Sequence, residues 1–144
     1  MKRHESLAPL SREHHTALIL AQILKKGAPA YKGLPTETAE KIMYAKNIFH
    51  SSLQEHFRKE ELLIDKVGHF HPDIEKLGKE IYLEHAQLTR SFLNLGISAD
   101  IEDSMDILGH TLEAHIRKEE RILFPLIQEY CPENELANMS LLLQ

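Results

Sequence analysis

The chain has little cysteine, tryptophan, glycine or proline. Its one cysteine, Cys131, can form neither an internal disulfide nor a cysteine-based metal site, and tryptophan is missing altogether. Glycine and proline occur six times each in 144 residues, which excludes collagen-like and low-complexity chains. The 42% hydrophobic and 27% charged residues are those of an ordinary globular protein.

Long apolar runs and isolated basic clusters are also missing. The longest apolar stretch, residues 17–24, contains Gln22 and is too short to span a bilayer. Seventeen basic residues are interleaved with 22 acidic ones, giving a net charge of −5, which disfavours nucleic acid and anionic membranes as partners. No apolar segment follows the initial MKRHESL, so we expect no secretory signal and a cytoplasmic location.

Histidine, in contrast, is abundant. The chain has ten, several times the usual share for its length, and this excess needs a chemical explanation. The length itself corresponds to about one domain, in which folding buries roughly two-thirds of the surface of the unfolded chain. One hydrophobic core can therefore form without disulfides.

Turn-forming residues divide the chain into four long helices and one short one. We expect the long helices over about residues 9–26, 36–67, 73–95 and 98 or 100–123, and the short one over about 133–142. Thr36, Asp73, and either Ser98 or Asp100 are the candidate N-caps. Pro125 is expected to kink or end the fourth helix.

Core positions in the long helices recur with alternating spacings of three and four, so each helix has one apolar stripe. The stripes contain residues 7, 10, 14, 17, 21 and 24; 42, 45, 49, 52, 56, 60, 63 and 67; 74, 77, 81, 85, 88, 92 and 95; and 101, 105, 108, 112, 115, 119, 122 and 126. Short connections favour antiparallel neighbours. We therefore predict an all-α fold, an antiparallel up-down-up-down four-helix bundle with a short extra C-terminal helix, forming a single domain over residues 1–144 (bundle about 7–130).

Apart from Ser52, only histidine and glutamate interrupt these stripes. The interrupting residues are His14, His56, Glu60, His85, His115 and Glu119, one histidine from each helix. Burying a carboxylate without a partner costs several kcal/mol, and a neutral histidine needs partners for both ring nitrogens. The six residues must therefore satisfy one another or bind something.

The second and fourth helices share a motif, HFRKEE from His56 and HIRKEE from His115. In both, histidine and glutamate are four residues apart and lie on one face, one turn apart. Together with one histidine from each other helix they form a mixed nitrogen and oxygen set that suits two borderline metal ions, with carboxylates bridging ions about 3.5–4 Å apart. A single such pair is a weak signal, but two copies in register predict a metal site, which zinc or manganese would also fit.

Three neighbours of these residues are further candidates. His15 competes with His14, although the residues at the stripe spacings from His15 form a mixed face. Glu61 and Glu120 lie one residue beyond the stripes, either as solvated surface charges or as groups that orient the ligands. We assign no metal to the remaining histidines, which are His4, His50, His69, His71 and His110.

The runs LSREHHTAL, HFRKEE, LEHAQL and HIRKEERILFP resemble hemerythrin-like proteins of the HHE cation-binding group, over roughly residues 7–129. The resemblance implies a four-helix bundle with an oxo- or hydroxo-bridged non-haem di-iron centre. Glu60 and Glu119 would bridge the two iron ions and the four histidines would cap them. Such a protein binds or senses O2 or NO, or responds to the cellular redox and iron state.

The sequence departs from the oxygen-carrying hemerythrins at two places. Those proteins have two histidines one turn apart on the third helix, whereas Ile81 and Thr89 flank His85 here. Their last motif ends in aspartate at a spacing of five, whereas this chain has Glu119 at four and Glu120 at five. One imidazole fewer leaves room for water or a small ligand, which disfavours simple reversible oxygen transport.

Three other functions remain open from the sequence. Iron–sulfur repair proteins share the four-histidine, two-glutamate set but commonly carry an N-terminal cysteine segment, which this sequence does not show. A di-iron enzyme that activates oxygen or peroxide is another, although ferritin-type sites use Glu-x-x-His with carboxylates dominating. The third is a metal-free structural bundle, whose stability would not change when a chelator is added. The C-terminal segment with Leu136, Met139, Leu142 and Leu143 either caps the bundle or pairs two chains in a homodimer.

Overall fold

The computed structural model of the chain describes residues 2–97 and 99–144, and all regular structure in these residues is helical. The main elements are α1 (Ala8–Leu24), α2 (Thr38–Ile48), α3 (Gln54–Val67), α4 (Pro72–Leu93), α5 (Ile101–Lys118), α6 (Phe124–Tyr130) and α7 (Glu133–Leu142). A π-helix, Phe49–Leu53 (η1), joins α2 to α3, and a second, Glu119–Leu123 (η3), joins α5 to α6. A short 3₁₀-helix, Gly68–Phe70 (η2), precedes α4. The all-α prediction is confirmed.

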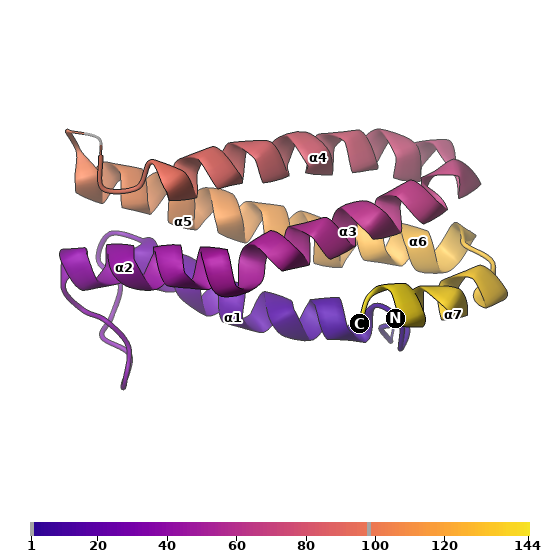
Figure 1. Ribbon diagram of the computed structural model, residues 1–144, viewed down its shortest axis with the longest axis horizontal. Helices are drawn as coiled ribbons and strands as arrows, with labels where there is room; N and C mark the ends of the chain where they lie inside the picture. The colour runs from indigo at the N-terminus through magenta and orange to yellow at the C-terminus, as the bar shows by residue number, and fades with distance from the viewer. Residues whose placement is uncertain (1, 98) are drawn as a thin grey trace.

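Four helical segments run side by side along the long axis of the molecule: α1, α2 with α3, α4, and α5 with α6 (Figure 1). The connections between them lie alternately at opposite ends of the molecule (Figure 1). The most extensive contact is between α1 and α5, and α4 packs against both α3 and α5. Residues far apart in the sequence therefore lie close together, as where the backbone N–H of His4 donates a hydrogen bond to Gln128 in α6 (2.9 Å).

The apolar side chains form two clusters, one on each side of the middle of the helices. One contains Leu63, Ile81 and Leu123 among others, and the second contains Phe49, Phe92 and Leu112. In each long segment the polar stripe residues fall between the two clusters. The polar site is therefore enclosed along the helix axes by packed apolar side chains.

The C-terminal helix α7 covers the end of the first apolar cluster. Leu136, Met139 and Leu143 are buried in that cluster, whereas Leu142 is 41% exposed. Of the two roles expected for this segment, the cap is the one that the contacts of α7 show. Without α7, apolar side chains of this cluster from α3 and α6 would be exposed to water.

Two of the predicted N-caps are wrong. Thr36 precedes the helix, and Glu37 is the N-cap of α2 without a side-chain hydrogen bond to the helix. In α4 the cap is His71 instead of Asp73: the ring of His71 accepts a hydrogen bond from the backbone N–H of Asp73 (3.0 Å). Pro72 occupies the first turn, where its missing N–H needs no partner.

The N-cap of the fourth segment is Asp100, one of the two expected residues. Its side chain accepts a hydrogen bond from the backbone N–H of Asp103 (3.2 Å). The alternative, Ser98, lies outside the described residues. The predicted end near Leu123 is wrong, because the helical backbone continues through η3 into α6. Pro125 lies in the first turn of α6.

The two π-helices displace the predicted stripes. A π-turn contains one residue more than an α-turn before the same face returns, so positions beyond it shift along the sequence. Ser52 and Leu126 are consequently only half-buried, and Ile122 is 49% exposed. Leu53, Leu123 and Ile127 are buried in the core. The spacing rule was wrong at these positions because it assumes a regular α-helix.

No helix in residues 2–97 and 99–144 combines the length and the apolar character needed to cross a membrane.

Candidate metal centre

The six polar residues of the stripes lie together in the middle of the molecule. His14 comes from α1, His56 and Glu60 from α3, His85 from α4, His115 from α5, and Glu119 from the first position of η3. Each is at most 3% exposed, and in the described part of the chain Ser6 is the only other buried polar residue. Long-range packing thus gathers four histidines and two glutamates at one site.

Glu60 meets three imidazoles. Its Oε2 lies 3.0 Å from Nε2 of His14 and 2.9 Å from Nε2 of His56. Its Oε1 lies 3.0 Å from Nε2 of His85. The carboxylate therefore lies between three helices and faces the Nε2 atom of a histidine from each.

Glu119 is placed differently. Its Oε1 lies 3.1 Å from Nε2 of His115 and 3.2 Å from Nε2 of His14, but neither contact is aligned as a hydrogen bond. Both Glu119 oxygens and Nε2 of His115 are buried without a hydrogen-bond partner among the described residues. Burying carboxylate oxygens that accept no hydrogen bond costs free energy even beside two imidazoles, so these atoms fit a site that receives a cation.

The ligand atoms form two overlapping groups of four. One group is His14, His56, Glu60 and Glu119, and the other is Glu60, His85, His115 and Glu119, with the ligand atoms of each group within 4.8 Å of one another. Each group offers two imidazole nitrogens and carboxylate oxygens, a mixed set that suits borderline transition metals. Either group could hold a metal ion, and both glutamates belong to both groups.

A second ring of glutamates surrounds the histidines. Nδ1 of each histidine contacts a glutamate from the adjacent segment: His56 with Glu13 (2.7 Å), His85 with Glu61 (2.7 Å), His115 with Glu84 (2.7 Å) and His14 with Glu120 (3.3 Å). Because an ionised carboxylate only accepts, the proton must be on Nδ1 in each pair. This contact holds the ring so that Nε2 points inward, the arrangement that supports a metal-bound histidine.

The structure resolves the candidates that the sequence left open. His14 is buried in the site whereas His15 is exposed. Glu61 and Glu120 lie at the edge of the site and contact Nδ1 of His85 and His14, as expected for groups that orient the ligands. Neither belongs to the two groups that could hold a metal ion.

Sequence reasoning missed Glu13 and Glu84. Both directly precede a stripe histidine, in the dipeptides Glu13–His14 and Glu84–His85. Each lies beside the stripe of its own helix and contacts a histidine of another helix: Glu13 contacts His56 and Glu84 contacts His115. Glu61, which follows Glu60, contacts His85 in the same way. The available signal was that each helical segment has a glutamate directly beside one of its inner ligands: Glu13 beside His14, Glu61 beside Glu60, Glu84 beside His85 and Glu120 beside Glu119.

The other five histidines lie outside the site. His110 is 61% exposed and contacts Asp106, while His50 contacts Gln54 four residues further on. His4, His69 and His71 belong to the N-terminal segment and the turn before α4. None of the five belongs to the two groups that could hold a metal ion.

Carboxylates raise the pKa of the buried histidines. Burial alone would lower the pKa of His14, but its contacts with Glu119, Glu120 and Glu60 raise it to about 12. Burial also opposes the charge on His56, yet Glu60 and Glu13 raise its pKa to about 9.

Contacts between imidazoles and carboxylates also shift the pKa of His115 and Glu60. Burial would lower the pKa of His115, but Glu119 and Glu84 raise it to about 10. Burial would raise the pKa of Glu60, and His56, His14 and His85 instead hold it well below its usual value. Without a metal ion these pKa shifts favour imidazolium–carboxylate pairs in the site, with protons on nitrogens that a cation would otherwise bind.

Aromatic rings fix two of the histidines. Phe57 stacks on His85 with 4.1 Å between ring centroids and 13° between planes. Phe124 lies parallel to His14 at 5.7 Å and 10°. These contacts limit rotation of the imidazoles and keep water from two faces of the site.

Comparison with protein-family models, curated proteins and solved structures finds no match to this chain.

Proposed function

We propose that this chain is a hemerythrin-like domain, an antiparallel four-helix bundle whose buried site holds a non-haem di-iron centre, and that it binds or senses O2 or NO. The proposed ligands are His14, His56, Glu60, His85, His115 and Glu119. The main supporting observation is the buried Glu119 carboxylate, which has no hydrogen-bond partner among the described residues and belongs to both four-residue groups. A cation between the carboxylates and imidazoles would remove the cost of that burial.

Each proposed ligand has a distinct role. Glu60 and Glu119 would be shared between two ions, because both belong to both groups. One ion would take the histidines of α1 and α3, and the other those of α4 and α5. Iron is the metal that the resemblance implies, and it would supply reversible binding of a diatomic ligand together with a change of oxidation state. The same nitrogen and oxygen donors also accept zinc or manganese.

The protein's own contribution is orientation and burial. The four Nδ1 contacts keep every Nε2 directed inward, and the stacked Phe57 shields His85 from solvent. The four imidazoles and two carboxylates would hold the ions, and any coordination position that they leave would be open to a small ligand.

The direct test is the metal content and optical spectrum of the freshly purified protein, before and after reduction and exposure to O2, NO and azide. We expect about two irons per chain and absorption bands that change with the added ligand. Stoichiometric zinc with no spectral response would instead indicate a structural metal site. Failure to take up metal after reconstitution would leave a metal-free bundle and refute the proposal.

The same preparation separates binding from catalysis. Steady turnover with peroxide or Fe(II) would show an oxygen- or peroxide-activating enzyme instead of a binding or sensing protein. A spectral change that reverses when the ligand is removed, without turnover, is the result expected here.

A further inference from the structure

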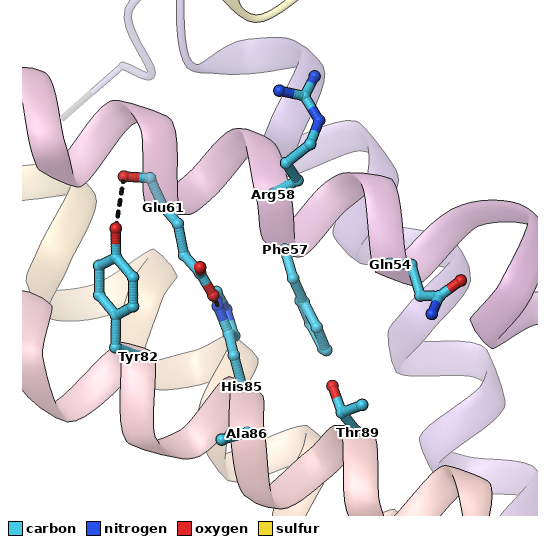
Figure 2. Close-up of a pocket in the computed structure, with 8 residues that line it drawn as sticks. All are labelled: Gln54, Phe57, Arg58, Glu61, Tyr82, His85, Ala86 and Thr89. Atoms are coloured by element: carbon cyan, nitrogen blue, oxygen red, sulfur yellow. Dashed lines mark hydrogen bonds and ion pairs between the residues drawn. The ribbon is translucent and has the colours of Figure 1, made fainter.

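A surface depression of about 550 Å³ lies between α3 and α4 and reaches one of the proposed ligands. Figure 2 shows the side chains that line it, which are Gln54, Phe57, Arg58, Glu61, Tyr82, His85, Ala86 and Thr89. The stacked rings of Phe57 and His85 form its floor. The depression therefore ends at the histidine that separates it from the buried carboxylates.

Glu61 connects this depression to the site. Its Oε2 lies 2.7 Å from Nδ1 of His85, and Nε2 of the same ring lies 3.0 Å from Oε1 of Glu60. Glu61 is half-buried, whereas Glu60 is fully buried. The His85 imidazole thus lies between the solvent-accessible carboxylate of Glu61 and the buried carboxylate of Glu60.

Glu61 differs from the other glutamates of the outer ring in its electrostatic environment. Lys or Arg side chains lie near the other three: Lys59 near Glu13 (3.7 Å), Lys118 near Glu84 (2.6 Å) and Arg3 near Glu120 (3.1 Å). Within residues 2–97 and 99–144, Glu61 forms no ion pair with a lysine or arginine. Its charge is therefore the one in the ring that remains available to an incoming cation.

The nearby polar groups do not neutralise Glu61. The hydroxyl of Tyr82 contacts the backbone oxygen of Glu61 (3.3 Å) and the carboxylate of Asp65 (2.6 Å). Arg58 also lines the depression, but its guanidinium binds Glu55 instead. Figure 2 shows Arg58 directed away from His85.

A second depression, of about 500 Å³ between α4 and α5, offers a contrast. It reaches His115 in the same way, but it is lined by Lys118 and His110. Lys118 lies 2.6 Å from Glu84, so the carboxylate beside His115 is already compensated. An incoming cation at this face therefore finds a carboxylate that a lysine already pairs, unlike Glu61.

We propose that the α3–α4 depression is the route by which divalent transition-metal cations reach the site, with Glu61 as their first protein ligand. This inference rests on the proposed metal centre and adds the path to it. The cation exchanges water for a Glu61 oxygen and so replaces the contact between Glu61 and Nδ1 of His85. Loss of this contact leaves the His85 ring free to turn out of its stack on Phe57, and the ion passes to Glu60. The step exchanges ligands without any transfer of electrons.

The test measures Co(II) uptake by the metal-free full-length chain in a stopped-flow spectrometer, using Ala86→Leu and Ala114→Leu as a matched pair. Ala86 follows His85 and lines the proposed route, whereas Ala114 precedes His115 and lines the second depression. We expect Ala86→Leu to slow uptake about tenfold at unchanged final stoichiometry, and Ala114→Leu to leave the rate unchanged.

The charge of Glu61 is tested by Glu61→Gln, which keeps an oxygen that can accept from Nδ1 of His85. Uptake by the unmodified chain is expected to slow as ionic strength rises, because salt screens the attraction between Co(II) and Glu61. Glu61→Gln is expected to slow uptake about tenfold at low salt and to lose most of this salt dependence.

The outcomes separate the two proposals. Binding of Co(II) at equal rates by the unmodified chain, Ala86→Leu and Glu61→Gln would overturn the route and leave the metal centre intact. Slowing by Ala114→Leu instead of Ala86→Leu would move the route to the α4–α5 face and overturn the assignment of Glu61. No binding of Co(II) by the unmodified chain would overturn both.

Discussion

Four glutamates beside the buried stripes decide how the histidines of the site are oriented. Glu13, Glu61, Glu84 and Glu120 each lie next to an inner residue of their own segment and contact a histidine of another. The order runs from α1 to α3, α4, α5 and back to α1. Each helix thus supplies both a ligand and the group that orients its neighbour's ligand, which makes the site sensitive to the relative position of all four.

The adjacent pair His14 and His15 provides a test of the ligand assignment. His14→Gln removes an imidazole from one four-residue group, so Co(II) affinity is expected to fall by at least about 100-fold. His15→Gln changes an exposed side chain one residue away and is expected to leave the affinity unchanged. Titration of the metal-free variants with Co(II) measures both. Equal losses in the two variants would contradict the placement of His14 in a metal site.

The pH dependence of the metal-free protein follows from its histidines. Their pKa is 6.5 in the unfolded chain and is raised on folding to about 9 for His56, about 10 for His115 and about 12 for His14. A raised pKa stabilises the folded state fully below the unfolded value, and this stabilisation is lost as pH rises through the folded value. We expect the Tm of the metal-free protein to fall steadily above pH 6.5.

Metal loading should change that profile. Cations replace protons on the imidazoles, so metal binding strengthens as pH rises and compensates the lost histidine pairs. The gain in Tm on adding Co(II) is therefore expected to grow from pH 6.5 upward. Differential scanning calorimetry of both forms across this range measures it, and parallel pH profiles would contradict the replacement of protons by metal.

At the scale of the helices, the two π-helices position the site. Each lies next to one His–Glu motif: η1 ends three residues before His56, and η3 begins at Glu119. The extra residue in each π-turn changes which side chains face the core, so that Leu53 and Leu123 are buried beside the motifs. A regular helix would direct a different residue inward at both places.

The contact between α1 and α5 depends on a glycine. A Cβ atom at Gly109 would lie 2.7 Å from the backbone oxygen of Ala21 and 3.2 Å from Cβ of Leu24. Because a backbone oxygen cannot move without the helix, Gly109→Ala is expected to lower the free energy of unfolding by about 1–2 kcal/mol, despite the better helix propensity of alanine. Chemical denaturation measures this change.

Gly68→Ala is the matched control. The nearest atom to a Cβ at Gly68 would be Cα of Glu75 at 3.9 Å, and the backbone φ of −58° is one that alanine adopts readily. This variant is expected to be neutral or slightly stabilising. If Gly109→Ala proved equally neutral, α1 and α5 would have to separate more easily than their close packing indicates.

At the scale of the molecule, the site occupies the gap between two apolar clusters and links α1, α3, α4 and α5. A cation bound there would connect all four and would bind the folded state in preference to the unfolded chain. Stability is therefore expected to depend on metal.

Metal removal is the test at this scale. With free Co(II) at about 100 times its dissociation constant, binding adds about 2.7 kcal/mol, which corresponds to a Tm about 5–10 °C higher for a chain of this size. Excess chelator should reverse the gain. A Tm that is the same with Co(II) and with chelator would favour a structural role for the buried histidines and glutamates.

Much of the site could be predicted from the sequence because it depends on local periodicity. Spacings of three and four placed His14, His56, Glu60, His85 and His115 in the core, and burial of their charges required a partner. The same regularity failed at Ser52, Ile122 and Leu126, because a π-turn depends on how the whole helix packs and leaves no clear mark in the spacing.

The sequence by itself determined the all-helical fold class and the burial of the histidines and glutamates in the stripes, because hydrophobic periodicity reflects the face that each helix turns from water. The tertiary structure decided which neighbours complete the site. Contacts such as those of Glu13 with His56 and Glu84 with His115 join residues from different helices, and no local pattern specifies which helices become adjacent. The same packing left Glu61 beside an open depression without a lysine or arginine partner among the described residues, because lysines and an arginine reached the other three glutamates.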